Sequence, residues 1–252
     1  MQTVPRGSRM ALAAWEPDLE GESRGGGTGR VRCLVDLDAP CNLACPYCPR
    51  RTRGAPMDAS SALALADALA DQVVASGVGA ATAVFYGGEP LLERERLFEQ
   101  ARHLTIALGR AKVECELGLI TNGTLLDPAT AARLAQLGFT RASVTVGGTE
   151  QVHEMRRRSV GGTASYRAIL HNVSQARHHL DVTVRYELHS GMDAVRLPLL
   201  IADLEQFGVL GGERTVKVVV QSARSYAQQA RALFGAPRPG LYRHRESRDL
   251  DG

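Results

Sequence analysis

Short runs of apolar and β-branched residues alternate with longer amphipathic segments along most of the chain. Apolar positions in the longer segments recur every three or four residues, which is typical of helices that bury one face. Strands that alternate with helices predict a parallel sheet joined by right-handed crossovers. The predicted fold class is therefore α/β, either an open sheet or one curled toward a barrel. The expected strands are 31–37, 81–86, 113–121, 141–146, 181–188 and 214–221.

Capping residues mark the ends of the predicted helices. Asp58 or Ser60 is expected to cap the first helix, and Asp127 before Pro128 gives a later one a strong start. The triplet 161–163, Gly-Gly-Thr, is expected to open the helix before strand 181–188. Glycines, which favour the left-handed turn after a helix, are expected to stop the helices. They are Gly77, Gly109, Gly138 and Gly208.

Three short motifs follow the first three predicted strands. A cysteine-rich loop at 41–48 comes after the first, Gly-Gly-Glu-Pro at 87–90 after the second, and Asn122-Gly123 after the third. Ligands of such folds bind beyond the carboxyl ends of the strands, which meet at one edge. The sequence therefore predicts one binding site at this edge.

The cysteine loop places Cys41, Cys45 and Cys48 within eight residues. Thiolates this close are usually held by a metal or a cluster. A structural zinc takes four ligands and a ferredoxin-type cluster takes four cysteines, so three cysteines leave one position open. The alternative is a zinc site completed by a distant histidine such as His103 or His153. The Gly-Gly-Glu-Pro motif after the next predicted strand makes this zinc site the less favoured interpretation.

The cysteine loop has the pattern Cys41-x3-Cys45-x2-Cys48, with Tyr47 before the last cysteine. Downstream, residues 85–92 read Phe-Tyr-Gly-Gly-Glu-Pro-Leu-Leu. In these two motifs the chain resembles the radical S-adenosylmethionine (SAM) superfamily. The resemblance covers about 31–221 and implies a partial (β/α)6 barrel. The stretches 144–157 and 161–172 are similar to the corresponding region of peptide-modifying and sulfatase-maturing members.

This resemblance implies a [4Fe-4S] cluster held by Cys41, Cys45 and Cys48, with the amino and carboxylate groups of SAM on the fourth iron. Electron transfer to SAM would give a 5′-deoxyadenosyl radical that takes hydrogen from a substrate. Tyr47 is expected beside the adenine, the two glycines beside the methionine moiety, and Glu89 at its amino group. The expected cofactor-binding residues are Tyr47, Gly87, Gly88, Glu89, Pro90, Asn122, Thr145 and Arg185, the last three for ribose or carboxylate; no catalytic acid or base is assigned.

Two departures from the family pattern stand out. Gly147 occupies a position where the subgroup usually has an acidic residue, and no cysteine follows Cys115, so a cysteine-rich domain for further clusters is absent from this sequence. The expected function is a radical SAM enzyme acting on a peptide or protein. The alternatives are a truncated or inactive cluster-binding relative and an activating enzyme of a glycyl-radical enzyme.

Composition limits the partners and the compartment. Hydrophobic residues make up 44%, charged residues 23% and aromatic residues 5%, and the net charge is +3. Few aromatic residues and a dispersed charge argue against a nucleic-acid binder, and no stretch nears the roughly 20 apolar residues of a membrane span. Three of the five cysteines lie in one loop, unlike a secreted disulfide framework, which predicts the cytoplasm.

The expected organisation is a flexible glycine-rich leader (1–30), a radical SAM core (31–222), and a short helix with a disordered basic tail (223–252). The expected partners are the peptide or protein substrate and a reductant such as flavodoxin or ferredoxin.

Overall fold

The computed structural model describes residues 11–12, 29–48, 57–211, 214 and 216–222. In this part of the chain one sheet holds seven strands in sequential order, six of them parallel. Only β1 is antiparallel to its neighbour. The strands are β1 (Ala11–Leu12), β2 (Arg30–Asp36), β3 (Ala80–Tyr86), β4 (Glu114–Thr121), β5 (Phe139–Val146), β6 (Asp181–Leu188) and β7 (Lys217–Ser222).

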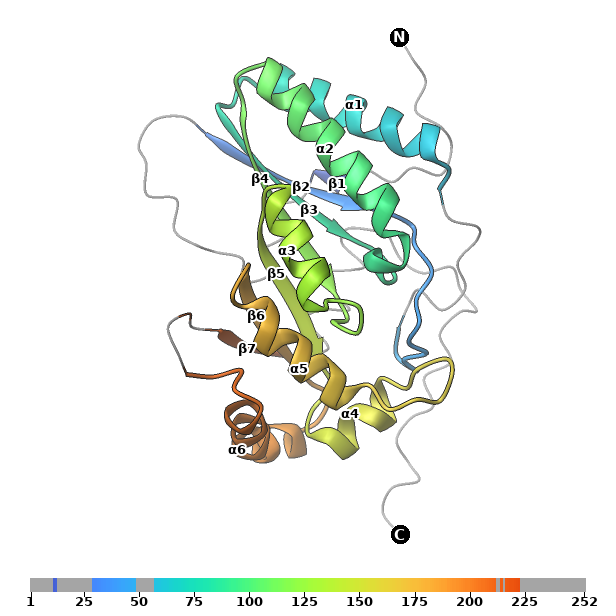
Figure 1. The fold of residues 1–252 in the computed structure, drawn as a ribbon, viewed down its shortest axis with the longest axis vertical. Helices are drawn as coiled ribbons and strands as arrows, with labels where there is room; N and C mark the ends of the chain where they lie inside the picture. The colour runs from blue at the N-terminus through green and yellow to red at the C-terminus, as the bar shows by residue number, and fades with distance from the viewer. Residues whose placement is uncertain (1–10, 13–28, 49–56, 212–213, 215, 223–252) are drawn as a thin grey trace.

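Helices connect the parallel strands, and Figure 1 shows α1, α2, α3 and α5 gathered on one side of the curved sheet. This arrangement is an α/β partial barrel of six parallel strands, as the sequence predicted. The helices are α1 (Ala59–Ala75), the 3-10 helix η1 (Pro90–Glu93), α2 (Arg94–Arg110), α3 (Pro128–Gln136), α4 (Glu150–Arg156), α5 (Tyr166–Ala176) and α6 (Gly191–Gln206).

The two faces of the sheet carry different residues because side chains alternate along a strand. On β4, Leu117 and Leu119 belong to the main core under the helices. Ile120 instead packs in a small second cluster with Leu34 and Val84, on the inner face. The inner face is otherwise largely polar, which leaves it suited to a ligand rather than to further packing.

An ionic network joins three strands near their amino-terminal ends. Glu116 Oε2 lies 3.0 Å from Arg30 Nη1 and 3.1 Å from Arg141 Nη2. Gly118 makes room for this network, since a Cβ there would lie 3.3 Å from Cγ of Arg141. The network holds β2, β4 and β5 together at the end of the sheet opposite the predicted site.

Most predicted element boundaries are confirmed within a few residues, and the caps explain why. Asp58 accepts the Ser61 N–H at 2.9 Å, and Asp127 accepts the Thr130 N–H at 2.8 Å, as expected of N-caps. The prediction that Gly109 stops α2 is wrong, because the helix continues to Arg110. The left-handed residue that follows is Lys112, with φ 60°.

Three further differences concern short elements. The triplet 161–163 does not open a helix, since α5 begins only at Tyr166. Helix α4 was not predicted, because its seven residues carry only a single turn of apolar pattern. Ala11–Leu12, inside the predicted leader, form β1. The remaining expectations for 1–28 and 223–252 lie outside the described residues.

Candidate functional site

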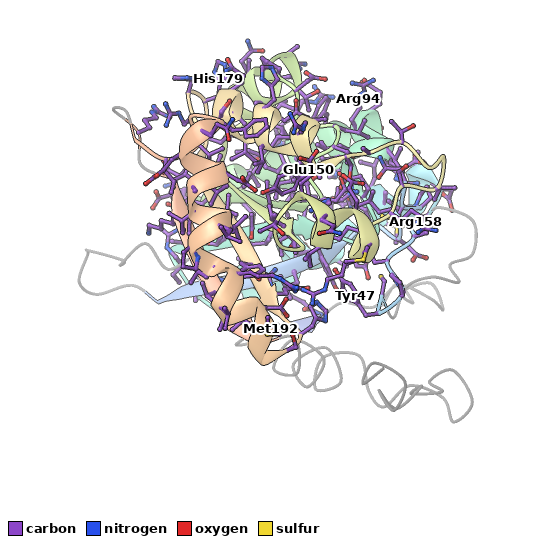
Figure 2. The ribbon with its side chains drawn as sticks, turned by 90° about the horizontal axis from the view of Figure 1, so that it is seen from below. Tyr47, Arg94, Glu150, Arg158, His179 and Met192 are labelled. Atoms are coloured by element: carbon purple, nitrogen blue, oxygen red, sulfur yellow. The ribbon has the colours of Figure 1, made fainter. Side chains whose placement is uncertain are left out.

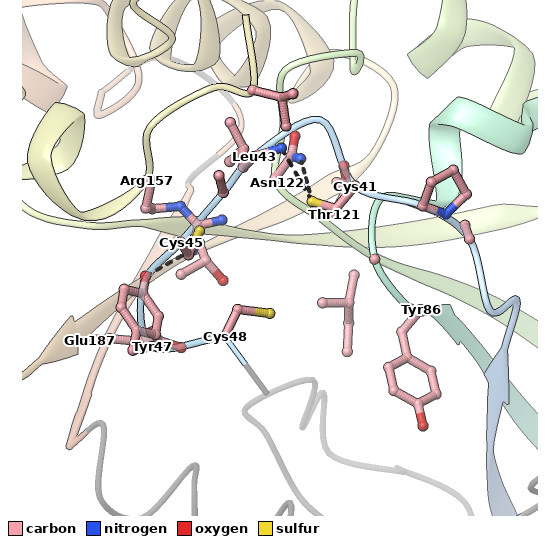
Figure 3. A pocket seen from close by; sticks show the side chains of 18 of the residues that line it. Cys41, Leu43, Cys45, Tyr47, Cys48, Tyr86, Thr121, Asn122, Arg157 and Glu187 are labelled. Atoms are coloured by element: carbon pink, nitrogen blue, oxygen red, sulfur yellow. Dashed lines mark hydrogen bonds between the residues drawn. The ribbon is translucent and has the colours of Figure 1, made fainter. Parts of the chain in front are cut away.

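A cavity of about 460 Å³ lies at the carboxyl ends of the parallel strands (Figure 3). Polar strand ends and the cysteine loop surround it, so the motifs that follow three separate strands do meet at one place. The predicted site residues that line it are Cys41, Cys45, Tyr47, Cys48, Gly87, Gly88, Asn122, Thr145 and Arg185. The other two predicted residues, Glu89 and Pro90, are buried beside it.

The loop after β4 holds the cysteine loop on one side. The Asn122 amide donates to Asn42 Oδ1 at 2.8 Å and lies 3.8 Å from Cys41 Sγ. Asn42 in turn donates to Thr124 Oγ1 at 2.8 Å. Asn122 was predicted to contact ribose or carboxylate; its amide nitrogen in this structure fixes the cysteine loop.

A second segment, 158–160, holds the cysteine loop from the other side through backbone contacts. The Ala44 N–H donates to the Arg158 carbonyl at 2.7 Å, and the Val160 N–H donates to the Asn42 carbonyl at 2.8 Å. Leu43 and Ser159 form an isolated antiparallel bridge between these donors. The cysteine loop is therefore anchored by hydrogen bonds on both sides, which fixes where its thiols lie.

Gly88 is required by the backbone that leads into the cysteine loop. Its φ is 52°, a left-handed value, and a Cβ there would lie 2.0 Å from the Ala39 carbonyl oxygen and 2.5 Å from that of Pro40. The Glu89 N–H donates to this same Pro40 oxygen at 2.8 Å. The sequence prediction ascribed this glycine to the approach of SAM, whereas the structure supplies a reason within the chain itself.

Gly88→Ala is expected to lower the free energy of unfolding by about 3 kcal/mol or more, because it adds backbone strain and a clash with main-chain oxygens that cannot move away. Urea unfolding of the two proteins measures the difference. Gly161→Ala is the matched control, since no atom lies within 4 Å of its added Cβ. Equal losses in both variants would contradict the close approach at Gly88.

The Glu89 side chain is fully buried and its carboxylate joins two loops. It accepts the Leu91 N–H at 3.0 Å and the Asn122 N–H at 2.7 Å, and Thr121 Oγ1 lies 2.8 and 2.9 Å from its two oxygens. Burial raises the pKa of this carboxyl group, while these donors act in the opposite direction. Glu89 thus fixes the end of β4 against the glycine loop. Its predicted contact with the amino group of SAM stays a prediction.

Two residues that line the cavity, Arg157 and Glu187, were not predicted as site residues. His189, whose ring contacts that of Tyr47, was not predicted either. Arg157 lines the cavity, is 8% exposed and donates from Nη1 to Tyr47 Oη at 3.2 Å. The ring of Tyr47 lies 4.6 Å from that of His189, just before α6 begins at Gly191. Figure 2 shows Tyr47 at the same end of the molecule as Met192, which lies in the first turn of α6.

Burial and charge act in opposite directions on the ionisable groups of the cavity. Burial raises the pKa of Cys41 and of Cys45, and Arg157 lowers that of Cys45. Burial also raises the pKa of Tyr47 to about 12, so its hydroxyl is neutral and accepts from Arg157. The guanidinium of Arg157 is therefore a cation that favours the thiolate form of Cys45.

Neither histidine considered for a zinc site is placed to serve one. His103 lies on α2 and pairs with Asp67 of α1 at 2.6 Å. His153 is fully buried: its Nδ1 accepts the Gly147 N–H at 3.2 Å, so Nε2 carries the proton and faces Ser165 Oγ at 3.2 Å. Both rings are occupied by structural contacts away from the thiols.

His153 is expected to make the protein lose stability in acid. Burial, aided by Arg157, lowers its pKa from 6.5 to about 3. The unfolded state takes up this proton below pH 6.5 and the folded state does not, so stability present above pH 6.5 is lost as the pH falls toward 3, by at most about 1.4 kcal/mol per pH unit.

Urea unfolding between pH 7 and about 4 tests this expectation. His153→Gln removes the titrating group, so its stability is expected to fall less steeply with acid than that of the unsubstituted protein. His178→Gln, at an exposed position beyond α5, is the control. Parallel curves for His153→Gln and the unsubstituted protein would count against a neutral buried imidazole.

The donor set fits an iron–sulfur cluster better than a single metal ion. In the described ranges, no three His, Cys, Asp or Glu side chains converge as they would on one ion. A cubane cluster needs no such convergence, because each cysteine binds a different iron. The three loop cysteines are free thiols facing one cavity, as this arrangement requires.

The fold and site together define a class of protein: a partial α/β barrel with a three-cysteine loop over a cavity at its strand ends. Residues 40–194 match the Radical SAM superfamily. The chain belongs to this superfamily, as the cysteine and glycine motifs predicted. The cofactors of this superfamily are a [4Fe-4S] cluster and SAM, in agreement with the prediction.

Curated relatives include proteins with different activities. A GTP 3′,8-cyclase of Synechococcus sp. (strain CC9902) is 37% identical over 153 residues, 60% of this chain and 42% of the relative. A serine-type anaerobic sulfatase-maturating enzyme of Klebsiella pneumoniae is 28% identical over 194 residues, 71% of this chain and 48% of the relative. The chain thus spans less than half the length of these relatives.

The fold is also found among solved structures. Native anSMEcpe with bound AdoMet and Cp18Cys peptide superposes with a TM-score of 0.61 at 18% identity, over 76% of this chain and 51% of that one. This likeness supports the partial barrel. Among the residues described, no helix has both the length and the apolar character needed to cross a membrane.

Proposed function

We propose that this chain holds a [4Fe-4S] cluster through Cys41, Cys45 and Cys48 and cleaves SAM reductively at it. The observation that carries the proposal is the cysteine loop itself: three free thiols, anchored on both sides, face a cavity with no fourth cysteine. When bound, the cluster supplies the electron that splits SAM and yields the 5′-deoxyadenosyl radical.

The cavity wall offers polar groups for SAM. Thr145 and Arg185 are direct partners across β5 and β6, so their side chains project from the same face of neighbouring strands. A guanidinium suits the carboxylate of the methionine moiety, and the threonine hydroxyl suits a ribose oxygen. Both residues line the same cavity as the loop cysteines, which supports the predicted assignment.

Glu89 and Gly88 act mainly by positioning. Glu89 holds Asn122 and Thr121, and Gly88 admits the backbone at Ala39. These contacts fix the glycine loop, the end of β4 and the cysteine loop relative to one another. The arrangement is suited to presenting backbone groups of Gly87 and Gly88 to the amino end of SAM, with Tyr47 near its adenine.

The proposed substrate is a peptide or protein. The support is a similar fold in a structure with a bound peptide and a similar sequence in a sulfatase-maturating enzyme. A nucleotide is the second candidate, because the GTP 3′,8-cyclase relative has the higher identity, 37%. An inactive cluster-binding relative and a glycyl-radical activating enzyme remain the further alternatives, and the proposed compartment is the cytoplasm, with flavodoxin or ferredoxin as reductant.

Anaerobic reconstitution with iron and sulfide, followed by SAM and dithionite, tests the proposal. We expect formation of 5′-deoxyadenosine, measured by chromatography. A cluster without SAM cleavage would favour the inactive relative and contradict an enzyme.

Substrate class is tested by adding a cysteine- or serine-containing peptide library or GTP, each deuterated at carbon, to the same reaction. Deuterium in 5′-deoxyadenosine from the peptides alone supports the proposal. Deuterium from GTP alone would establish the nucleotide alternative.

A further inference from the structure

Arg157 is a buried cation beside the second cysteine of the loop. Figure 3 shows its guanidinium directed toward Cys45 and Tyr47. It reaches this place because Gly147 has no side chain: a Cβ there would lie 3.1 Å from Cδ and 3.2 Å from Cγ of Arg157. The acidic residue expected at position 147 in the subgroup would occupy the space that the arginine stem fills.

The charge of Arg157 is poorly screened from the site. The residue is 8% exposed, and in the described chain its guanidinium donates one hydrogen bond, to the neutral hydroxyl of Tyr47. Its Nε atom is buried without a hydrogen-bond partner there. A guanidinium remains protonated even when buried, so this positive charge stays in the cavity at any working pH.

We propose that the buried guanidinium of Arg157 raises the reduction potential of the cluster held by the cysteine loop. This inference rests on the proposed function. In the step concerned, one electron from a low-potential reductant converts the oxidised cluster to the reduced cluster, with no bond made or broken. The added negative charge is stabilised by a nearby cation that water does not screen, and nearby charge and solvent exposure are among the factors that set such potentials.

Glu187 opposes this effect in part. It is 5% exposed and lines the same cavity as Arg157, so a carboxylate and a guanidinium of opposite charge both face the site of the cluster. Glu187 is therefore a second buried residue of the cavity, with the opposite charge, whose removal is expected to shift the potential the other way.

The test is a reductive titration of the reconstituted protein, with dithionite, redox mediators and electron paramagnetic resonance of the reduced cluster. In Arg157→Gln, we expect the ratio of reduced to oxidised cluster at a fixed ambient potential to fall on the order of tenfold, a shift of about 59 mV for one electron. Arg157→Lys keeps the charge and is expected to stay near the unsubstituted protein. Glu187→Gln is expected to shift the potential upward.

Arg158→Gln is the matched control, because this neighbouring arginine is exposed and its charge is screened by water. An unchanged potential in Arg157→Gln would overturn the inference. So would an equal shift in Arg157→Lys and Arg157→Gln, which would assign Arg157 a purely structural role.

A second pair covers the case in which Arg157→Gln does not retain a cluster. Gly147→Asp and Gly147→Asn add nearly the same bulk against the Arg157 stem, but only aspartate adds a negative charge. We expect a lower potential with aspartate, and equal potentials would overturn the inference. The titration requires a bound cluster but no SAM, so failure to cleave SAM would defeat the proposed function without affecting this result.

Discussion

Cys45→Ala is expected to remove both the visible absorbance of the iron–sulfur cluster and the formation of 5′-deoxyadenosine. Cys45 is the central cysteine of the loop, and with two ligands left the cluster has too few thiolates to be retained. Iron and sulfide analysis after anaerobic reconstitution measures the first effect, and chromatography of the SAM reaction measures the second.

Cys33→Ala and Cys115→Ala are the matched controls. Both thiols lie on strands within or against the core under the helices, away from the cavity. Burial raises the pKa of each to about 11, which keeps them as neutral thiols. These variants are expected to retain the cluster. A Cys45→Ala protein with a full complement of iron would show that the ligands are assigned wrongly.

Glu89→Ala is expected to lower the free energy of unfolding by about 3–5 kcal/mol, because it leaves buried donors without an acceptor. The donors are the N–H groups of Leu91 and Asn122 and the hydroxyl of Thr121. Loss of this anchor also releases the glycine loop from the end of β4. We therefore expect SAM affinity, measured by equilibrium dialysis on the reconstituted protein, to fall at least tenfold.

Glu99→Ala, an exposed carboxylate on α2, is the control and is expected to change neither quantity. Glu89→Gln separates shape from charge, since it keeps one acceptor oxygen. A Glu89→Ala protein as stable as the control would contradict a structural role for this carboxylate. Normal stability with lost SAM affinity would instead favour the direct contact with the amino group that the sequence predicted.

The fold was predictable because it is encoded locally. Each strand is a short apolar run, each long helix has a regular apolar face, and caps such as Asp127 act within one turn. Sequential parallel strands then bring the ends of β2, β3 and β4 to one edge, which is why the cysteine loop, the glycine loop and Asn122 were expected together.

Arg157 was not predictable, because its role depends on contacts between distant parts of the chain. It reaches the site only because segment 158–160 pairs with the cysteine loop and Gly147 leaves room for its stem. The short helix α4 that carries the chain to this point has too few residues to show a clear periodic pattern. Neither contact leaves a signal in the local sequence.

Glu187 was predictable and was missed. It lies two residues after Arg185 on β6, so the alternation of side chains along a strand places both on the inner face. The reason for a glycine at position 88 was predicted only in part. The sequence indicated a close approach to this residue and assigned it to SAM, whereas in the structure the approaching group is the carbonyl of Ala39.

The central claim is that the three-cysteine loop leaves one iron open to SAM. Electron paramagnetic resonance of the dithionite-reduced cluster, recorded with and without SAM, tests it most directly. We expect SAM to change the spectrum of the unsubstituted protein, because its amino and carboxylate groups take the open position. A spectrum unchanged by saturating SAM, in a protein with a fully loaded cluster, would contradict the claim.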